Sequence, residues 1–365
     1  YGDHRDLHVR SRRQRQMCIR DRCNICAAWN NLSAPSRCTQ NPTMGEEWRK
    51  RWHPEKIAPK ESDSTILIVG AGPAGLEAAL ALGKRGYKVI LSEARKELGG
   101  RVILESRLPS LSEWVRVKDY REQQFLKLPN VEVYLNSNLN AEDVFLTKAD
   151  HIVIATGAKW RADGLGRNNP IGIDNLEVSN QVFTPDDIMM GHCPKGEVVI
   201  FDDDYYYMAP VIAEMLQKQG CQVTFITTSD MVCSFGNYTS EQFSAQKALI
   251  NAGVKMIFSQ NIHAYDGKNI DLKCMYTERS SKLKTKAIVM VTARLPNDKL
   301  YYKLQNLIEV GKDKFTSIKS IRRIGDCEAP APIASAVYAG RKYALELDDT
   351  SGINYSMRRD INFGS

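Results

Sequence analysis

Short apolar segments alternate with an amphipathic stretch from residue 65 onward. Residues 66–70 (ILIVG) form a continuous apolar run, which predicts a short buried strand, and residues 87–93 (YKVILSE) predict a second strand. Between them, residues 76–86 have apolar positions at helical spacing and end at a glycine. Strand, glycine-rich turn, helix and strand in this order are typical of the opening β-α-β unit of a nucleotide-binding sheet.

The same pattern recurs later in the chain. The sequence predicts further strands at residues 131–135 and 151–155, a second β-α-β unit at residues 197–202, 207–220 and 222–228, and a final strand and helix at residues 321–326 and 333–347. We therefore predict an α/β fold with two Rossmann-like, doubly wound modules, the second inserted in the first.

The first turn, VGAGPAG, has the glycine spacing that a bound diphosphate requires. Gly70 permits the tight turn, Gly72 lets the backbone approach the diphosphate, and Gly75 allows close packing of helix on strand. The diphosphate would lie at the positive end of the helix that follows. Glu93 closes the second strand, where its carboxylate can accept hydrogen bonds from both ribose hydroxyls. We therefore predict that this module binds the ADP part of a dinucleotide.

Three further segments favour FAD over NAD in this module. Residues 98–101 (LGGR) follow the ribose-binding acid, where two-domain flavoproteins pass a glycine pair beneath the diphosphate. Residues 155–158 (ATGA) end a predicted strand, and residues 324–326 (IGD) precede a helix and place Asp326 near the ribityl or ribose side. The predicted ligand is therefore FAD, or ADP in its place.

These elements set the expected domain boundaries. The FAD- or ADP-binding module comprises residues 61–181 together with 315–347, and a degenerate NAD-type module comprises residues 182–314, as in glutathione-reductase-like proteins. Residues 23–60 form a short, irregular, cysteine-rich segment and linker, and residues 348–365 form a polar tail.

The second module has acids and an aromatic residue where its glycines belong. Asp202, Asp204 and Tyr207 occupy the three glycine positions, and the following strand ends in Thr227 and Thr228 without a ribose-binding acid. Carboxylates at this turn repel a diphosphate, and side chains block its close approach. We therefore predict that this module keeps the fold and has lost NAD(P)H binding.

The composition is that of an ordinary globular protein. Of the 365 residues, 43% are hydrophobic and 25% are charged, and no apolar run is long enough for a membrane span. We expect a cytoplasmic protein without a membrane partner.

The formal net charge of +7 depends largely on residues 1–22, which hold seven arginines against three aspartates. The run RRQRQMCIRDR in this stretch resembles translated sequencing-adapter read-through. We therefore interpret residues 1–22 as a non-native or disordered arm in front of the back end of a longer protein. No aromatic stacking set or nucleic-acid-binding module follows this arm, so we expect no nucleic-acid partner.

Cysteines gather near the start of the chain. Cys23, Cys26 and Cys38 have the Cys-x2-Cys-x11-Cys spacing of three ligands of a [4Fe–4S] cluster. Zinc held by thiolates is an alternative that the spacing leaves open. The expected first cysteine would fall at position 20, which is Arg20, and Cys18 has a different spacing to Cys23. We therefore predict a cluster segment whose ligand set is incomplete in this chain.

Several segments together resemble the C-terminal half of the trimethylamine/dimethylamine dehydrogenase family, which are old-yellow-enzyme-related iron–sulfur flavoproteins of the NADH:flavin oxidoreductase family. The resemblance is carried by CNIC, RCTQNPTMGEEWRKRWHPEK, VGAGPAGLEAA, LGGR, LPNVEVY, ATGAKWRADG, DDDYYYMA, VTARLPND and IGDCEAP. It implies a preceding TIM barrel, absent from this chain, that carries FMN and the substrate site. It also implies electron flow through the cluster to an external acceptor, typically an electron-transferring flavoprotein, and a full-length homodimer.

The resemblance also implies roles for individual residues. The metal ligands would be Cys23, Cys26 and Cys38, with Arg20 as the departure from the family pattern. The nucleotide would be surrounded by Gly70, Gly72, Gly75, Glu93, Gly99, Gly100, Arg101, Thr156, Gly157 and Asp326. The resemblance assigns no catalytic residue to this chain.

The sequence thus predicts the electron-transfer and dinucleotide-binding portion of an amine dehydrogenase-like oxidoreductase, inactive alone. Two alternatives stay open. One is a non-catalytic ADP-binding scaffold that docks a partner flavoprotein, and the other is an NAD(P)H-dependent flavin or enoyl reductase.

Overall fold

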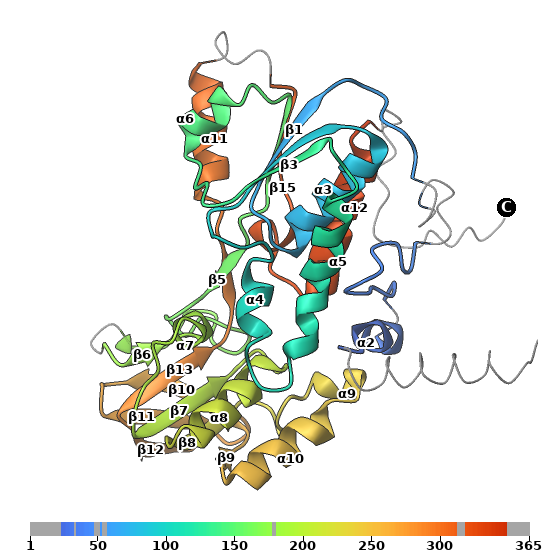
Figure 1. Cartoon of the computed structure of the whole chain (residues 1–365). Coiled ribbons are helices and arrows are strands. Elements are labelled where there is room, and N and C mark those ends of the chain that lie inside the picture. Colours follow the sequence, from blue (N-terminus) through green and yellow to red (C-terminus); the bar gives the residue numbers. More distant parts are fainter. Residues whose placement is uncertain are drawn as a thin grey trace, which may run out of the picture. The chain divides into compact units, whose positions relative to one another are not determined.

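The computed structural model describes residues 23–32, 34–46, 52, 57–176, 180–311 and 318–348. Within these residues the chain divides into two compact units (Figure 1). The nucleotide unit lies within residues 25–103, 115–158 and 296–348, and the second unit lies within residues 23–24, 104–114 and 159–295. The predicted arm at residues 1–22 and the tail beyond Asp348 lie outside the described residues.

A parallel five-stranded sheet forms the centre of the nucleotide unit, with strand order β15-β4-β1-β2-β3. Its strands are β1 (Thr65–Val69), β2 (Lys88–Ser92), β3 (Val131–Tyr134), β4 (His151–Ile154) and β15 (Ser320–Arg323). In the register of the sheet, Ile66 of β1 lies opposite Val89 of β2 and His151 of β4. Since β1 lies between β2 and β4, the turn that follows it opens at the carboxyl edge, where doubly wound sheets bind ligands.

Helices cover both faces of this sheet, as Figure 1 shows. On one face lie α3 (Pro73–Arg85), α5 (Arg116–Phe125) and α12 (Ile333–Glu346), and on the other lie α6 (Ala141–Leu146) and α11 (Lys299–Val310). Side chains of β1 alternate between the two cores: Ile66 and Ile68 pack with α3, whereas Leu67 and Val69 pack with α6 and α11. Burial on both faces explains the continuous apolar run of this strand. Short helices of this unit are α2 (Ile25–Asn31) and η3 (Gly325–Cys327), whereas α4 (Arg101–Glu105) and η1 (Ser112–Val115) each contain residues of both units.

The second unit has its own parallel sheet, with strand order β6-β13-β7-β8-β9. Its strands are β6 (Val182–Phe183), β7 (Glu197–Asp202), β8 (Gln222–Thr227), β9 (Lys255–Ile257) and β13 (Ala287–Val291). The helices are α7 (Pro185–Met189), α8 (Met208–Lys218), α9 (Gly236–Thr239) and α10 (Gln242–Ala252), and a separate antiparallel sheet is formed by β10 (Gln260–Tyr265), β11 (Asn269–Cys274) and β12 (Ser280–Lys284).

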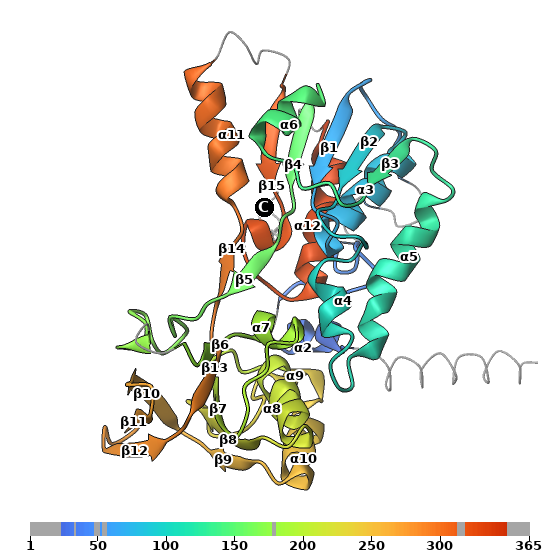
Figure 2. The ribbon, with the colours of Figure 1, turned by 60° about the vertical axis from the view of Figure 1, so that its left-hand side comes forward.

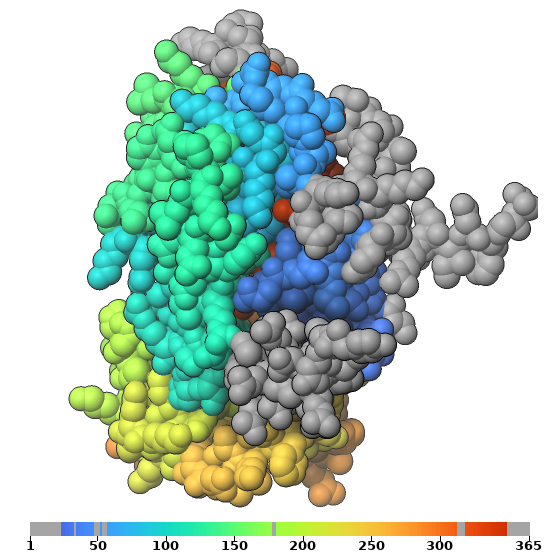
Figure 3. All heavy atoms as spheres, turned by 45° about the vertical axis from the view of Figure 1, so that its right-hand side comes forward, coloured from blue at the N-terminus to red at the C-terminus, as the bar shows by residue number. Residues whose placement is uncertain are grey.

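The two faces of this second parallel sheet are covered differently (Figure 2). Val198 and Ile200 pack with α8 and α10, whereas Val199 and Phe201 pack against the antiparallel sheet. Helix α10 is drawn in gold in Figure 3. Its residue Phe243 is 75% exposed.

The chain passes between the units at β5 (Ala158–Trp160) and β14 (Arg294–Pro296), which pair in a two-stranded sheet. These crossings lie earlier in the chain than the module boundaries expected at 181/182 and 314/315. The residues that follow β5 pack with the second unit, because their loop lies on the ends of that unit's strands. Residues 104–114, which run from the end of α4 into η1, also belong to the second unit.

The predicted fold class is confirmed, since both units are doubly wound α/β modules with parallel sheets. The predicted strand–helix–strand units correspond to β1-α3-β2 and β7-α8-β8, and the predicted final strand and helix correspond to β15 and α12. No helix among the described residues is long and apolar enough to cross a lipid bilayer.

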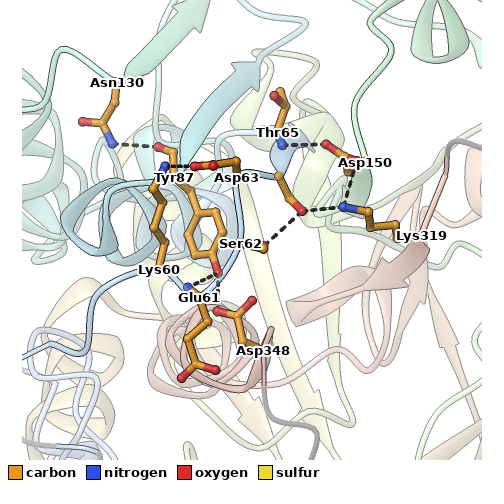
Figure 4. A network of polar contacts seen from close by, with 11 residues as sticks. Lys60, Glu61, Ser62, Asp63, Thr65, Tyr87, Asn130, Asp150, Lys319 and Asp348 are labelled. Carbon is orange, nitrogen blue, oxygen red and sulfur yellow. Dashed lines mark hydrogen bonds and ion pairs between the residues drawn. The ribbon is translucent and has the colours of Figure 1, made fainter.

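A polar network fastens the amino end of β1 to distant parts of the nucleotide unit (Figure 4). Asp150 Oδ2 accepts a hydrogen bond from Thr65 N at 2.8 Å, and Asp150 Oδ1 lies 3.1 Å from Lys319 Nζ. Lys319 Nζ also donates to Ser64 Oγ at 2.9 Å. These contacts lie at the opposite end of β1 from the glycine turn, so they fix the strand whose far end forms the candidate site.

Candidate nucleotide-binding site

The turn after β1 requires glycine at two of its three glycine positions. Gly70 has φ +104°, and a Cβ there would lie 2.5 Å from Ala155 O, directly after the neighbouring strand β4. A Cβ on Gly75 would lie 1.9 Å from Gly70 O, so this position needs glycine for the approach of α3 to the turn. Gly72 differs, because a Cβ there would meet no heavy atom within 4 Å. The turn is therefore closed at Gly70 and Gly75 and open at Gly72.

Helix α3 begins at this open position. Gly72 is its N-cap, no side chain caps it, and its first turn contains no acidic residue. The first N–H groups of a helix have no partner within the helix, and together with the helix dipole they attract an anion. The open glycine and the uncapped helix start thus fit a diphosphate.

Glu93 lies directly beside this turn. Its side chain is 6% exposed, and Oε2 accepts a hydrogen bond from Ala71 N at 2.8 Å while Oε1 accepts one from Arg95 N at 3.0 Å. Each carboxylate oxygen can accept more than one hydrogen bond, so the group keeps capacity for ribose hydroxyls. The carboxylate therefore also organises the protein turn, a role that the sequence alone did not indicate.

The predicted glycine pair lies against the same turn. Gly99 N donates to Ala71 O at 2.8 Å, and a Cβ on Gly100 would lie 3.0 Å from Gly72 Cα. Both glycines have positive φ, +111° and +57°. The Arg101 guanidinium, one residue further along, donates to Ala158 O.

The predicted Ala-Thr-Gly segment follows β4 and borders the turn. Thr156 Oγ1 donates to Asn297 O at 2.6 Å, and Asn297 N donates back to Gly157 O at 2.9 Å. Gly157 has φ +75° with open space where a Cβ would be. Its carboxyl-edge position places this open backbone on the same side of the sheet as Gly72.

Asp326 lies in η3, close to the start of α3. A Cβ on its neighbour Gly325 would lie 2.6 Å from Ala74 Cβ, and Asp326 Oδ1 accepts a hydrogen bond from Ala331 N at 3.1 Å. The structure therefore gathers all the predicted nucleotide-binding residues around one end of one sheet, while their contacts with a cofactor stay predictions. A bound FAD would supply a redox-active isoalloxazine ring at this site, whereas ADP would supply no redox chemistry.

Two contributions to the site were missed from sequence. Arg95 Nη1 donates to Gly100 O at 3.3 Å, which adds a cation beside the turn. A Cβ on Gly340 of α12 would lie 2.2 Å from Ala74 O, so α12 packs against the first turn of α3 without an intervening side chain. The glycine at position 340, within the helical pattern of residues 333–347, was the sequence signal that could have indicated this close helix packing.

The cysteine segment contains three half-buried cysteines, Cys23, Cys26 and Cys38, which form no disulfide among the described residues. Gln40 N donates to Cys38 Sγ at 3.4 Å, and the neighbouring Arg37 pairs with Glu46 at 2.7 Å. The Arg37 guanidinium also stacks 3.8 Å from the ring centroid of Tyr338 in α12.

A metal-binding arrangement of these thiols is not formed in the structure. Among the described residues, no three His, Cys, Asp or Glu side chains are placed together to hold a metal ion. Cys18 and Arg20 lie outside the described residues. The thiols as placed therefore do not fit a [4Fe–4S] cube, and the ligand role of Cys23, Cys26 and Cys38 stays a prediction.

The corresponding turn of the second unit is filled by its own acids. Asp202 is fully buried, and its Oδ1 accepts hydrogen bonds from Asp204 N at 3.2 Å and Tyr205 N at 3.0 Å. Burial raises the pKa of the Asp202 carboxyl well above its usual value. The Tyr207 hydroxyl, at the third glycine position, lies 3.1 Å from Glu105 Oε2. Side chains thus take up turn contacts that a dinucleotide would need.

The fold and the glycine turn define an oxidoreductase of the two-module flavoprotein type. Residues 64–186 match the family model described as pyridine nucleotide-disulphide oxidoreductase, and residues 183–299 match the OYE-like second alpha/beta domain. The two matches correspond to successive parts of the chain.

More specifically, the chain is homologous to amine dehydrogenases. It is 35% identical over 356 residues to dimethylamine dehydrogenase from Hyphomicrobium sp. (strain x), and the match covers 90% of this chain and 48% of that relative. Histamine dehydrogenase from Rhizobium sp. 4-9 has a solved structure with 42% identity and a TM-score of 0.88, covering 94% of this chain and 53% of that chain. The structure of 6-hydroxypseudooxynicotine amine oxidase from Pseudomonas geniculata N1 has 41% identity and a TM-score of 0.84, covering 89% of this chain and 48% of that chain.

These likenesses confirm the resemblance to amine dehydrogenases inferred from the motifs. The chain spans about half the length of the curated relatives it matches, at 48%, 47% and 46% of the first three.

Proposed function

We propose that this chain is the nucleotide-binding and electron-transfer part of an amine dehydrogenase-like flavoprotein, with FAD or ADP held in the nucleotide unit. The observation that carries the proposal is the open, uncapped start of α3 at Gly72, bordered by the buried Glu93 carboxylate. Homology to dimethylamine dehydrogenase supports the reaction class.

The residues of this chain bind and orient rather than transfer protons to a substrate. The N–H groups at the start of α3 would hold the diphosphate, and Glu93 would accept hydrogen bonds from the ribose. The backbone at Gly157 leaves room for the ligand on the same edge, and Asp326 would approach the ribose or ribityl side.

The substrate chemistry belongs to the part of the relatives that this chain does not match. We place FMN and the amine pocket there, on a TIM barrel, so this chain alone would not oxidise an amine. In the full-length homodimer, electrons would leave to an external acceptor such as an electron-transferring flavoprotein. Iron and sulfide analysis of the full-length protein would test the predicted [4Fe–4S] cluster.

An absorption spectrum of the purified chain separates redox function from an ADP-binding scaffold. Visible flavin bands, with FAD released on denaturation, would support a redox-active nucleotide unit. A colourless chain that releases ADP would support the scaffold, in which the nucleotide stabilises the fold and the chain docks a partner flavoprotein.

A separate experiment tests the alternative that this chain is part of an NAD(P)H-dependent reductase. The buried Asp202 and the Tyr207 side chain at the second turn argue against this reductase. Anaerobic addition of NADH to a flavin-loaded sample should leave the flavin oxidised. Stoichiometric bleaching of the flavin by NADH would contradict the proposed exclusion of NADH and favour the reductase.

A further inference from the structure

A compact loop in the second unit lies where that unit would bind a dinucleotide. We call residues 163–172 the crevice loop. It is closed on itself, because Asp163 O accepts a hydrogen bond from Ile173 N at 3.0 Å and Asn169 O accepts bonds from Gly166 N at 3.1 Å and Gly172 N at 3.3 Å. In the sequence, the loop follows β5 and precedes β6, the first strand of the second unit's parallel sheet.

The crevice loop lies on the carboxyl ends of β7 and β13. A Cβ on Gly166 would lie 2.3 Å from Asp203 Oδ2 and 3.1 Å from Thr292 Cβ. Asp203 follows β7 and Thr292 follows β13, the two strands that are adjacent in the sheet order β6-β13-β7-β8-β9. The strand order reverses between β7 and β13, and in doubly wound sheets this switch point is where dinucleotides bind.

Asn168 holds the loop in this place through its side-chain amide. Asn168 Nδ2 lies 2.5 Å from Asp203 Oδ1, 2.5 Å from Tyr205 Oη and 3.1 Å from Thr228 Oγ1. Its backbone N–H donates to Asp203 Oδ2 at 2.9 Å, so one fully buried carboxylate receives both groups. Asn168 therefore donates two hydrogen bonds to the two oxygens of one buried side chain.

A second asparagine secures the other side of the loop. The side-chain amides of Asn169 and Asn261 donate to each other, at 2.8 Å and 2.9 Å. Asn169 is 8% exposed, and Asn261 lies in β10 of the antiparallel sheet. The crevice loop is thus fastened at two consecutive residues to two different elements.

We propose that the crevice loop is a built-in occupant of the second unit's dinucleotide crevice, with Asn168 bound in place of a ligand, so that this unit excludes NAD(P)H. The two acids have complementary roles. Asp202 accepts hydrogen bonds from N–H groups of the turn, and Asp203 accepts hydrogen bonds from Asn168 of the crevice loop. The inference goes beyond the proposed function, because it concerns the second unit and holds whether or not the nucleotide unit binds ADP.

Hydrogen–deuterium exchange of the whole chain tests this occupancy. In the wild-type chain, the amides of Leu165, Gly166, Asn168 and Gly172 should be protected, because each donates a hydrogen bond within the loop or, for Asn168, to the buried Asp203 carboxylate. Gly166→Ala removes no hydrogen bond but places a methyl against Asp203, and Asn168→Asp places a second carboxyl group against the first. Each variant should speed exchange across the loop by roughly tenfold or more, with β7 and β8 still protected.

Asn251→Asp is the matched control for Asn168→Asp, since Asn251 is an exposed residue of α10 outside the crevice. It should leave exchange of the loop unchanged. NADH titrated into the wild-type chain should show no saturable binding below roughly millimolar concentration. Free exchange of these four amides in the wild type, unchanged exchange in both loop variants, or tight NADH binding that ADP does not displace would each overturn the proposal. ADP titration in parallel reports on the nucleotide unit separately.

Discussion

Replacing Gly72 with alanine should separate nucleotide binding from folding of the nucleotide unit. A Cβ at this position meets no heavy atom within 4 Å, and the backbone angles of φ −72° and ψ −178° suit any residue. Gly75→Ala is the matched variant, because the same methyl there would lie 1.9 Å from Gly70 O. Both substitutions add one carbon to the same turn, three residues apart in a single motif.

The two variants should differ in their free energy of unfolding. In Gly72→Ala, the smaller entropy of the unfolded chain stabilises the fold by about 0.4–1 kcal/mol. Alanine is a poorer N-cap than glycine by up to about 1 kcal/mol, so the free energy of unfolding should change by less than about 1 kcal/mol. In Gly75→Ala, overpacking against backbone should cost about 1–3 kcal/mol or more.

The binding cost follows from where the methyl points. At Gly72 it enters the open space that a diphosphate would approach, so affinity for ADP should fall at least tenfold, about 1.4 kcal/mol. Calorimetric ADP titration and urea unfolding of the two variants and the wild type measure both quantities. Unchanged ADP affinity in a folded Gly72→Ala chain would refute a diphosphate at this turn, and a Gly72→Ala chain that fails to fold would refute the open geometry.

Three further substitutions test the supports of the site. Glu93→Gln should leave one of two backbone N–H donors facing an amide N–H₂, lowering the free energy of unfolding by about 1–3 kcal/mol and weakening ADP binding, as measured by urea unfolding and calorimetry. The pKa of Asp150 lies below its usual 3.8. The largest cause is the hydrogen bond from Thr65 N, which lowers the pKa, and burial, the next largest, raises it without cancelling this effect. A carboxyl whose pKa is lowered by folding stabilises the folded state at pH values above 3.8, and this stability is lost as the pH falls through the folded-state pKa. Asp150→Asn should therefore lower the free energy of unfolding in urea by about 1 kcal/mol at neutral pH and by nothing in strong acid. An equal cost at both pH values would contradict this assignment. Arg121→Met should remove the cation 2.8 Å from the buried Glu77 carboxylate and leave it only Arg341 at 3.5 Å, so the free energy of unfolding in urea should fall by up to about 3 kcal/mol; a neutral effect would show that this ion pair is dispensable.

The nucleotide unit was largely predictable because its signals are local. The apolar run of β1, the helical spacing of α3 and the acid that ends the following strand all lie within one β-α-β unit. Glycine at positions 70 and 75 is required by backbone contacts inside the same unit, so a sequence motif records the geometry directly.

The crevice loop was not predictable, because its contacts join residues far apart in the chain. Asn168 meets Asp203 and Thr228, and the sequence marks neither as its partner. The acids at 202 and 204 predicted loss of NAD(P)H binding by repulsion, but Asp203, between them, makes the contacts that fill the crevice. Residues 104–114 likewise join the second unit without a composition signal, since their place depends on tertiary packing.

Native mass spectrometry of the folded chain, incubated with ADP and with FAD and then exchanged into volatile buffer, tests the central claim most directly. We expect one adenine nucleotide per chain in the wild type and a clearly lower occupancy in Gly72→Ala at the same nucleotide concentration. A wild-type chain that stays free of both nucleotides while its circular dichroism is that of a folded α/β protein would contradict the account.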